Sequence, residues 1–347
     1  MERDYGNKTF WINMLEDKDK VILNKERILS LNRKNFNEPA NGLNNLKKLS
    51  FSMGMGVVVK RTKVKKQPCD ERIGEPLFDS NIESVLYPFE AVAILGISDN
   101  GKYYHIAGVS TVGYALCCDI AVTSSRNLWE YYLRPDKFYI VLNDDIKTPF
   151  GLPKLYMGTR IPLDKEGFFM IPAVEGAGVL AVEKIRPVFT EGFNYGYLEY
   201  TLENVISQAF SCIGGNYGWG GDFGGRDCSL FICDIMKTFG IIIGRNVENQ
   251  LKSGVSRIDI SNMQREGKEL LIKKLPVGTV LSFKGHTAMY IGCVGGRPYI
   301  IHSLARYMGS SGKTENVMKV LVTDIDIRRV KNGYSFIESF TDAVLFS

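Results

Sequence analysis

The stretch Tyr217–Gly240, YGWGGDFGGRDCSLFICDIMKTFG, decides how this chain is interpreted. Its first half is rich in glycine and ends at Asp227-Cys228-Ser229, and an apolar segment follows as far as Gly240. We interpret the stretch as a loop that leads into a buried helix whose first turn carries Cys228. The unpaired N–H groups and the dipole at a helix start stabilise a thiolate, so Cys228 is a candidate nucleophile. The alternative is a buried structural cysteine, which is what most free cysteines are.

Length and composition indicate a globular protein of several domains. The chain has 347 residues, of which 45% are hydrophobic and 23% are charged. This length predicts two to four domains, and the composition is that of a soluble globular protein. No uninterrupted apolar run approaches the roughly 18 residues that cross a bilayer. Basic residues cluster in Lys60–Lys66, but no recognisable nucleic-acid module accompanies them, and we expect no nucleic-acid partner.

Two further features concern location and cofactors. The N-terminal sequence MERDYGNKTFW lacks the apolar core of a signal peptide. We therefore expect the cell envelope or secretion if a signal segment has been removed, and the cytoplasm otherwise. The seven cysteines form no C-x-x-C pair and no finger-like Cys/His spacing, which argues against a structural zinc site. We expect neither a metal nor an organic cofactor.

The character of the sequence changes along the chain. Residues 1–50 carry apolar residues at near-helical spacing and predict a partly helical segment. From residue 51, short β-type runs separated by turn signals predict two small β-barrels, residues 51–125 and 126–190. Residues 191–347 mix helix and strand patterns. The expected fold class is therefore multidomain α+β, with two small barrels followed by an α+β domain that contains Cys228.

The C-terminal part predicts a helix before Cys228 and a hairpin after it. Apolar residues recur at helical spacing from Thr201 to Ile213, and Thr201 lies in a position that suits an N-terminal cap. Thr279–Val294 and Pro298–Ser303 are predicted strands, and Gly295-Gly296 marks the turn between them.

Two of the three histidines, His286 and His302, lie in this predicted hairpin. Cysteine catalysis requires a base near the sulfur and a third group that orients the base, and these histidines are candidates for the two roles. A two-residue turn at Gly295-Gly296 would place them on opposite faces, because side chains alternate along a strand. A Cys-His-His triad therefore requires an odd-length turn or a bulge near residues 294–298.

Several motifs resemble those of one protein family. Y-G-W-G-G, D-C-S, the strand H-T-A-M-Y-I-G and the strand I-I-H-S are similar to the NlpC/P60 cysteine peptidases, which have a papain-like core. Upstream, Leu155–Leu163 (LYMGTRIPL) and the segment from Phe78-Asp79 to Ile120 resemble the paired bacterial SH3 (SH3b) domains of one subgroup. The resemblance covers most of residues 50–347. It implies two SH3-like barrels followed by a papain-like catalytic domain at residues 191–347.

The resemblance also implies a reaction. The subgroup comprises γ-D-glutamyl-L-diamino acid endopeptidases, which act on murein peptides of the cell wall. Cys228 would be the nucleophile, His286 the base, and His302 the group that orients the base. The substrate would be a short peptide with a free N-terminal L-Ala, namely L-Ala-γ-D-Glu followed by diaminopimelate or lysine. We expect the protein to be a monomer.

Substrate-binding positions follow from the same resemblance. The aspartate and serine that flank the cysteine contact the substrate's amine in the subgroup, and here they are Asp227 and Ser229. An ammonium group beside Asp227 would form a charge-assisted pair, although Asp227 serves equally well as the N-cap of the helix. A tyrosine of the first SH3b domain lines the pocket, and Tyr114 is the candidate for it. We also expect Trp219, from the Y-G-W-G-G motif, to contact the substrate.

One position departs from the family pattern. Relatives tend to have Arg-Asn/Asp-Ser after the helix, with the serine reaching into the pocket, whereas this chain reads Arg245-Asn246-Val247. Two other functions use the same residues: an acyl- or amidotransferase with the same triad, and a non-catalytic cell-wall-binding protein. An open groove that reaches Cys228 would favour an enzyme over a binding protein.

Overall fold

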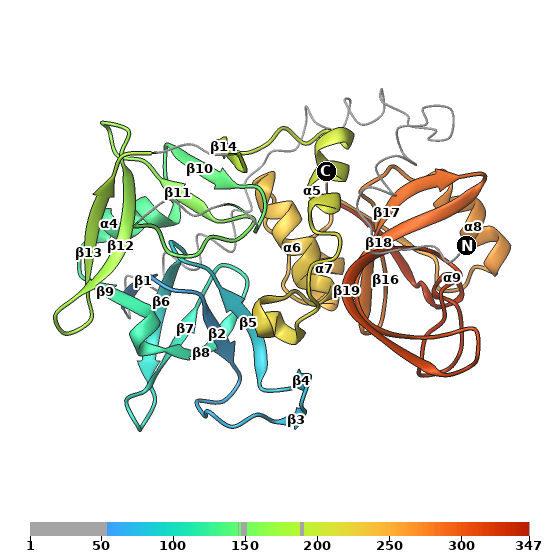
Figure 1. Ribbon diagram of the computed structural model, residues 1–347, viewed down its shortest axis with the longest axis horizontal. Helices are drawn as coiled ribbons and strands as arrows, with labels where there is room; N and C mark the ends of the chain where they lie inside the picture. The colour runs from blue at the N-terminus through green and yellow to red at the C-terminus, as the bar shows by residue number, and fades with distance from the viewer. Residues whose placement is uncertain (1–53, 145, 147–150, 188–190, 347) are drawn as a thin grey trace.

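The computed structural model describes residues 54–144, 146, 151–187 and 191–346 (Figure 1). The partly helical segment expected at residues 1–50 lies outside the described residues. The N-terminal half of the described chain is largely β, and the C-terminal half mixes helices and strands. The protein therefore has the mixed α+β class that the sequence predicts.

The N-terminal β region consists mainly of short strands. Its strands are β1 (Met55–Val58), β2 (Thr62–Lys65), β3 (Gly74–Glu75), β4 (Phe78–Asp79), β5 (Ile82–Leu86), β6 (Ala91–Ile97), β7 (Tyr103–Ala107), β8 (Val112–Leu116), β9 (Ile120–Thr123), β10 (Phe138–Val141), β11 (Arg160–Pro162), β12 (Phe169–Glu175), β13 (Val179–Ile185) and β14 (Phe193–Tyr195). The region also contains a short 3-10 helix, η1 (Cys117–Asp119), and the helix α4 (Arg126–Leu133).

Strands from both predicted barrels share one sheet. Nine strands follow each other in the order β12-β13-β9-β1-β6-β7-β8-β2-β5, and a separate three-stranded sheet has the order β11-β10-β14. β13 of the second segment joins β9 of the first through a parallel pair, Val179 opposite Val122. The described residues form no closed barrel. The expectation of two separate barrels is therefore not confirmed, because the open edge of β9 pairs with a strand of the other segment.

The helix α4 also joins the two β segments. Trp129 of α4 is completely buried, and its indole N–H donates to the carbonyl oxygens of Gly56 and Val92, each at 3.1 Å. Trp129 belongs to a hydrophobic core that takes apolar side chains from both segments. The two segments therefore share a core as well as a sheet.

The C-terminal part is built around a six-stranded antiparallel sheet with the order β15-β20-β16-β17-β18-β19. Its elements are α5 (Leu202–Ser211), η2 (Trp219–Gly224), α6 (Cys228–Thr238), α7 (Val247–Ser253), β15 (Ser256–Asp259), α8 (Arg265–Ile272), β16 (Val280–Phe283), β17 (His286–Val294), β18 (Arg297–Met308), β19 (Thr314–Asp324), α9 (Phe336–Ser339) and β20 (Asp342–Leu345).

Two sequence predictions for this part can be compared with the structure. The helix expected at Thr201–Ile213 is confirmed as α5, and the hydroxyl of Thr201 caps it by accepting from the N–H of Asn204 at 3.2 Å. The single strand expected at Thr279–Val294 is divided into β16 and β17. A turn at Lys284-Gly285 separates them, with Gly285 at a φ of 95°, a conformation that favours glycine.

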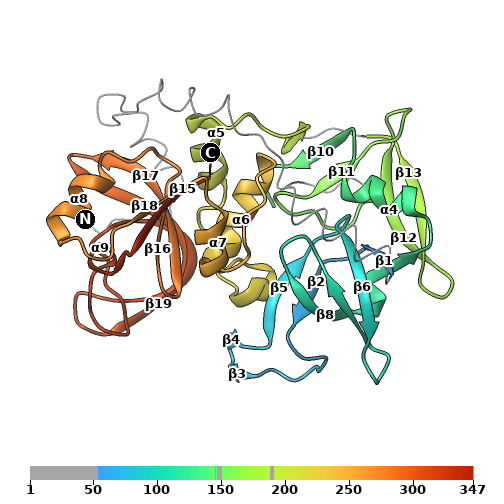
Figure 2. The same cartoon turned by 180° about the vertical axis from the view of Figure 1, so that it is seen from behind.

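The helix α6 lies at the centre of the molecule. Figures 1 and 2 show α5, α6 and α7 between the N-terminal β region and the six-stranded sheet. α6 is buried along nearly its whole length and contacts β17 and β18 on one side. On the other side, Asp234 of α6 accepts a hydrogen bond from Tyr87 of the β region at 2.6 Å. No helix in the described part of the chain combines the length and apolar character needed to span a membrane.

Candidate active site

The predicted position of Cys228 at a helix start is confirmed, because Cys228 is the first residue of α6. Asp227 is the N-cap residue, and its Oδ1 accepts from the N–H of Leu230 at 2.8 Å. The capping interpretation of Asp227 is therefore confirmed as well. The glycine-rich loop that precedes it forms the irregular helical segment η2.

A bulge brings the two histidines of the hairpin to the same face. The turn between β17 and β18 is the two-residue turn at Gly295-Gly296, which by itself would separate them. The register then shifts by one residue at Ile291 of β17. As a result, Nε2 of His286 lies 2.9 Å from Nδ1 of His302. The bulge that the triad requires is present, but it lies inside β17 rather than at residues 294–298.

The Cys228 thiol is almost completely buried, with 8% of the residue exposed. Burial, and after it the Asp227 carboxylate, raise the pKa of the Cys228 thiol to about 12. Backbone N–H groups of Thr287 and Ser229 act in the opposite direction, and the contact with Thr287 places the sulfur beside the start of β17. Loss of solvent outweighs the N–H groups at the helix start, so the stabilised thiolate expected from the sequence is not confirmed for this state.

Both histidines are buried and neutral. Burial, followed by the charge of Arg329, lowers the pKa of His286 to about 3, although Asp227 acts to raise it. Burial and the neighbouring His286 lower the pKa of His302 far below its ordinary value. Nε2 of His302 lies 3.3 Å from the hydroxyl of Thr323. The two imidazoles and this hydroxyl form one hydrogen-bonded chain.

Asp227 accepts more hydrogen bonds than its role as the N-cap of α6 requires. Arg245 donates to its two carboxylate oxygens at 3.1 and 2.7 Å, and the N–H of Gly220 donates to Oδ2 at 2.9 Å. The Ser229 hydroxyl donates to Oδ1 at 3.0 Å and accepts from Arg245 at 2.8 Å. Burial acts to raise the pKa of Asp227, but Arg245 and these hydrogen bonds leave it below its ordinary value. Asp227 is therefore an ionised carboxylate with a buried cationic partner.

A cleft of about 620 Å³ reaches the candidate nucleophile, and both Cys228 and His286 line it. Its walls come from distant parts of the chain: Lys66, Ile82 and Glu83 from the N-terminal β region, and Val247, Glu248 and Leu251 from α7. The cleft that these residues line is therefore large enough for a short peptide. Among the described residues, no three His, Cys, Asp or Glu side chains are arranged to hold a metal ion.

The structure brings Trp219 to the cleft but not Tyr114. Trp219 lines the cleft, is 38% exposed, and packs edge-on against Phe78 with ring centroids 5.9 Å apart. Tyr114 lies in β8 and stacks on His105 with ring centroids 4.8 Å apart, and it is not among the residues that line the cleft. The physical reason is the sheet order, in which β5 and not β8 forms the edge that contacts η2.

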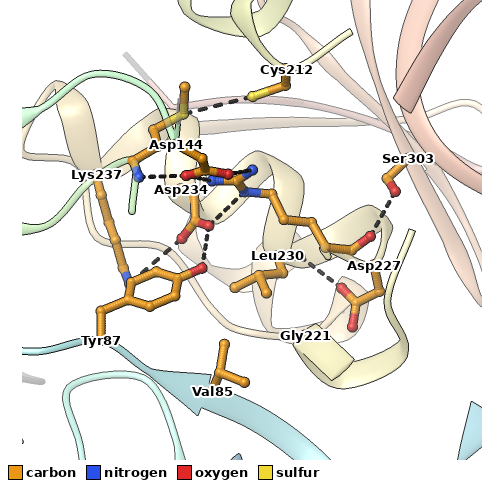
Figure 3. A network of polar contacts seen from close by, with 12 residues as sticks. Val85, Tyr87, Asp144, Cys212, Gly221, Asp227, Leu230, Asp234, Lys237 and Ser303 are labelled. Carbon is orange, nitrogen blue, oxygen red and sulfur yellow. Dashed lines mark hydrogen bonds and ion pairs between the residues drawn. The ribbon is translucent and has the colours of Figure 1, made fainter. Parts of the chain in front are cut away.

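A buried ion-pair network beneath the site was not predicted from the sequence (Figure 3). The Arg226 guanidinium donates to both oxygens of Asp144 at 2.6 and 2.8 Å and to Asp234 at 2.8 Å. Tyr87 donates to the same Asp234 carboxylate at 2.6 Å. The main chain of Arg226 is also held, because its carbonyl oxygen accepts from Ser303 at 2.7 Å. The network joins the N-terminal β region, α6 and β18.

The sequence contained one signal of this network. Asp234 interrupts an otherwise apolar helical segment, and a carboxylate in such a place requires a cation or hydrogen-bond donors. Its partners could not be identified from the sequence, because Asp144 and Tyr87 belong to parts of the chain that only the tertiary fold brings close.

Comparisons with known proteins give information on the family and the fold. Residues 214–334 match the model of the NlpC/P60 family. An NlpC/P60 endopeptidase from Photobacterium damselae subsp. piscicida is similar with a TM-score of 0.71 at 18% identity, over 92% of this chain and 83% of that chain. An NlpC/P60 family protein from Bacillus cereus ATCC 10987 is similar with a TM-score of 0.55 at 17% identity, over 84% and 99%. Comparison with curated proteins gives no match.

At these identities the likeness to solved structures shows the fold, and the family model supplies the assignment of the segment. Proteins of this family are cysteine peptidases known as peptidoglycan hydrolases and endopeptidases. The matched segment contains Cys228, His286 and His302. The chain therefore contains an NlpC/P60 family domain at residues 214–334, which follows a largely β N-terminal region.

Proposed function

We propose that the protein is a cell-wall peptide hydrolase that cleaves the γ-D-glutamyl-L-diamino acid bond of short murein peptides with a free N-terminal L-Ala. The observation that carries the proposal is the hydrogen bond between His286 and His302 at a cleft that Cys228 also lines. A cysteine at a helix start, with a base that a third group orients, is the arrangement of nucleophilic cysteine catalysis. The family match supports the reaction class, and the sequence resemblance supports the bond.

The chain of hydrogen bonds indicates which nitrogen acts as the base. In the tautomer that serves the reaction, Nε2–H of His302 donates to the hydroxyl of Thr323, and Nδ1 of His302 accepts from Nε2–H of His286. Nδ1 of His286 then carries a lone pair and can accept the proton of Cys228. The opposite tautomer would place a proton on that nitrogen and remove the base.

We further propose that attack and proton transfer occur together, because the resting thiol and imidazole are both neutral. The sulfur of Cys228 bonds to the γ-carbonyl carbon of D-Glu while its proton passes to Nδ1 of His286. The N–H groups at the start of α6 stabilise the oxyanion. The His286 imidazolium then protonates the leaving amine as the C–N bond breaks. Water activated by His286 finally releases the acyl group and restores the thiol.

The proposed binding site for the substrate's amine contains the carboxylate of Asp227, which already forms an ion pair with Arg245. Asp227 and Ser229 remain the proposed contacts, but the ammonium group would share Asp227 with Arg245. Glu83 on another wall of the cleft offers a second carboxylate, which is 32% exposed and lies 3.7 Å from Lys66. On this proposal residues 51–190 act as the SH3b-like region of the subgroup, since Ile82 and Glu83 close one side of the cleft.

The test is incubation with L-Ala-γ-D-Glu-diaminopimelate followed by mass spectrometry, beside the Cys228→Ala variant as the control. We expect L-Ala-γ-D-Glu and free diaminopimelate from the intact protein and no turnover from the variant. Intact substrate after incubation with the folded protein would refute the proposal. Added hydroxylamine distinguishes a transferase, which would give mainly the hydroxamate. The groove that reaches Cys228 already favours an enzyme over a non-catalytic wall-binding protein.

A further inference from the structure

The glycine-rich loop η2 has a backbone that needs support from its surroundings. Its φ angles are positive at Gly220 (60°), Gly221 (92°) and Phe223 (52°). Glycine adopts such angles readily, but Phe223 does so at an energetic cost, and 58% of this residue is exposed. Strained residues persist only where neighbouring contacts determine their conformation. The neighbours of η2 therefore matter for its shape.

Two cations of the N-terminal β region bind the centre of this loop. Asp222 is only 3% exposed at its side chain, and its carboxylate lies 2.5 Å from Nζ of Lys63 and 2.8 Å from the guanidinium of Arg72. Burial acts to raise the pKa of Asp222, but the hydrogen bonds of Lys63 and Arg72 outweigh it and keep the carboxylate ionised. Arg72 also lies over the ring of Phe223 at 5.1 Å, so it covers the strained residue as well.

The loop also packs closely on strand β5. A Cβ atom on Gly220 would lie 2.5 Å from Ile82, and one on Gly221 would lie 2.7 Å from Val85, so only glycine allows this approach. The guanidinium of Arg61 donates to the carbonyl oxygen of Gly221. Two residues of the basic segment Lys60–Lys66, namely Arg61 and Lys63, therefore contact η2.

The start of η2 is linked to two proposed substrate contacts. Trp219 at its start lines the cleft, and the N–H of Gly220 donates to Oδ2 of Asp227 at 2.9 Å. The position of Trp219 therefore depends on the conformation of the loop, and so does one of the hydrogen bonds of Asp227. In contrast, Cys228 and His286 lie in α6 and β17, which are held by the core of the C-terminal part.

We propose that Asp222 is a positioning residue and that Lys63 and Arg72 form a clamp that holds η2 in the shape that binds substrate. The N-terminal β region then shapes the substrate pocket through charge, in addition to bordering it. This inference rests on the proposed function and extends it, because it assigns substrate affinity to ion pairs outside the cleft. Opening the clamp should weaken substrate binding and leave the bond-breaking step nearly intact.

The first experiment separates KM from kcat. Lys63→Ala combined with Arg72→Ala should raise KM for the murein peptide about tenfold, since hydrogen bonds to a charged group are lost, and should change kcat less than about threefold. Lys65→Ala is the matched control: it removes the same charge from the same strand, but the Lys65 ammonium donates to the carbonyl of Cys69 at 2.6 Å. Lys63→Arg should keep the wild-type KM.

The second experiment does not depend on turnover. Hydrogen exchange followed by mass spectrometry should show at least about tenfold faster exchange in peptides covering residues 216–227 of the double variant, because loss of the ion pairs promotes local opening. Exchange in peptides covering α6 should stay at the wild-type rate, as it should everywhere in Lys65→Ala.

The outcomes of the two experiments are distinct. Unchanged exchange at residues 216–227 together with an unchanged KM would overturn the clamp. A fall in kcat at constant KM would also overturn it, because the loop would then serve the chemical step. Absence of turnover in the wild-type protein, with faster exchange in the double variant, would refute the proposed function while the mechanical part of the clamp stands.

Discussion

Nε2 of His286 lies 2.9 Å from Nδ1 of His302, and both rings are buried. This contact occupies Nε2 of His286, the nitrogen that does not serve as the base in the proposed reaction. The contact exists because Ile291 is an extra residue that bulges from β17. The two-residue turn alone would place the two histidines on opposite faces of the hairpin, and the bulge brings them to the same face. The relative placement of the two histidines therefore depends on a local irregularity of a single strand.

The role of His302 as an orienting group can be tested with two substitutions. His302→Leu should lower kcat by about a hundredfold or more, because no acceptor remains to fix the tautomer and orientation of His286. His302→Asn should retain much more activity, since an amide oxygen can accept from Nε2–H of His286. Steady-state kinetics measure both. Equal losses in the two variants would contradict an orienting role.

The hydroxyl of Thr323 should contribute through His302. Thr323→Val keeps the shape of the side chain and removes the group that lies 3.3 Å from Nε2 of His302. We expect kcat to fall about fivefold, which corresponds to one ordinary hydrogen bond, and Thr323→Ser to retain wild-type activity. An unchanged kcat in Thr323→Val would show that His302 needs no fixed tautomer.

The raised pKa of Cys228 predicts a particular pattern of alkylation. Iodoacetamide reacts with thiolate, so labelling of Cys228 should accelerate about tenfold per pH unit from pH 7 to 10 without reaching a plateau. Peptide mapping by mass spectrometry separates Cys228 from the other six cysteines. A plateau already at neutral pH would mean that the resting site holds a thiolate–imidazolium pair.

The buried neutral histidines predict loss of stability in acid. The folded-state pKa of His286 is about 3, below the ordinary value of about 6.5 that it regains on unfolding. Below about pH 6.5 the unfolded chain therefore binds more protons, and the free energy of unfolding should fall by about 1.4 kcal/mol per pH unit for each such histidine. The contribution is fully present above pH 6.5 and lost towards pH 3. Urea unfolding at pH 7.5, 6 and 5 measures it.

The His286→Asn variant is the control for this stability effect. The free energy of unfolding of this variant should depend less steeply on pH over the same range. The difference should correspond to about one bound proton, because one buried titrating group is gone. Identical slopes in the variant and the wild type would mean that His286 titrates similarly in the folded and unfolded chain.

Val247 stands where related proteins tend to have a serine, and we expect that introducing the serine increases activity. Val247 is the first residue of α7 and lines the cleft. Val247→Ser places a hydroxyl in the pocket and should raise kcat/KM for L-Ala-γ-D-Glu-diaminopimelate about threefold. An increase of this size is expected for one hydrogen bond to the substrate that replaces hydrogen bonds to water. Val247→Ala, which adds no hydroxyl, is the control. A loss in Val247→Ser would indicate that this wall binds an apolar group.

Local features of the candidate site could be predicted from the sequence. A glycine run, a capping aspartate and an apolar segment determine that a helix begins at Cys228, because each acts within a few residues. Strand patterns likewise placed His286 and His302 in one hairpin. The bulge at Ile291 was not located from the sequence, although the next residue, Gly292, has a φ of 112°. A glycine inside a strand pattern is a signal for such a bulge.

The amino-acid sequence by itself determined the residue types of the site and the local elements that carry them, because hydrogen bonding and side-chain periodicity act over short stretches. Only the tertiary structure decided the protonation of Cys228 and His286, since burial sets their pKa values. It also decided which parts of the N-terminal β region meet the site. Arg226 with Asp144, and Asp222 with Lys63, are pairs far apart in sequence, and their partners follow from packing rather than from any pattern along the chain.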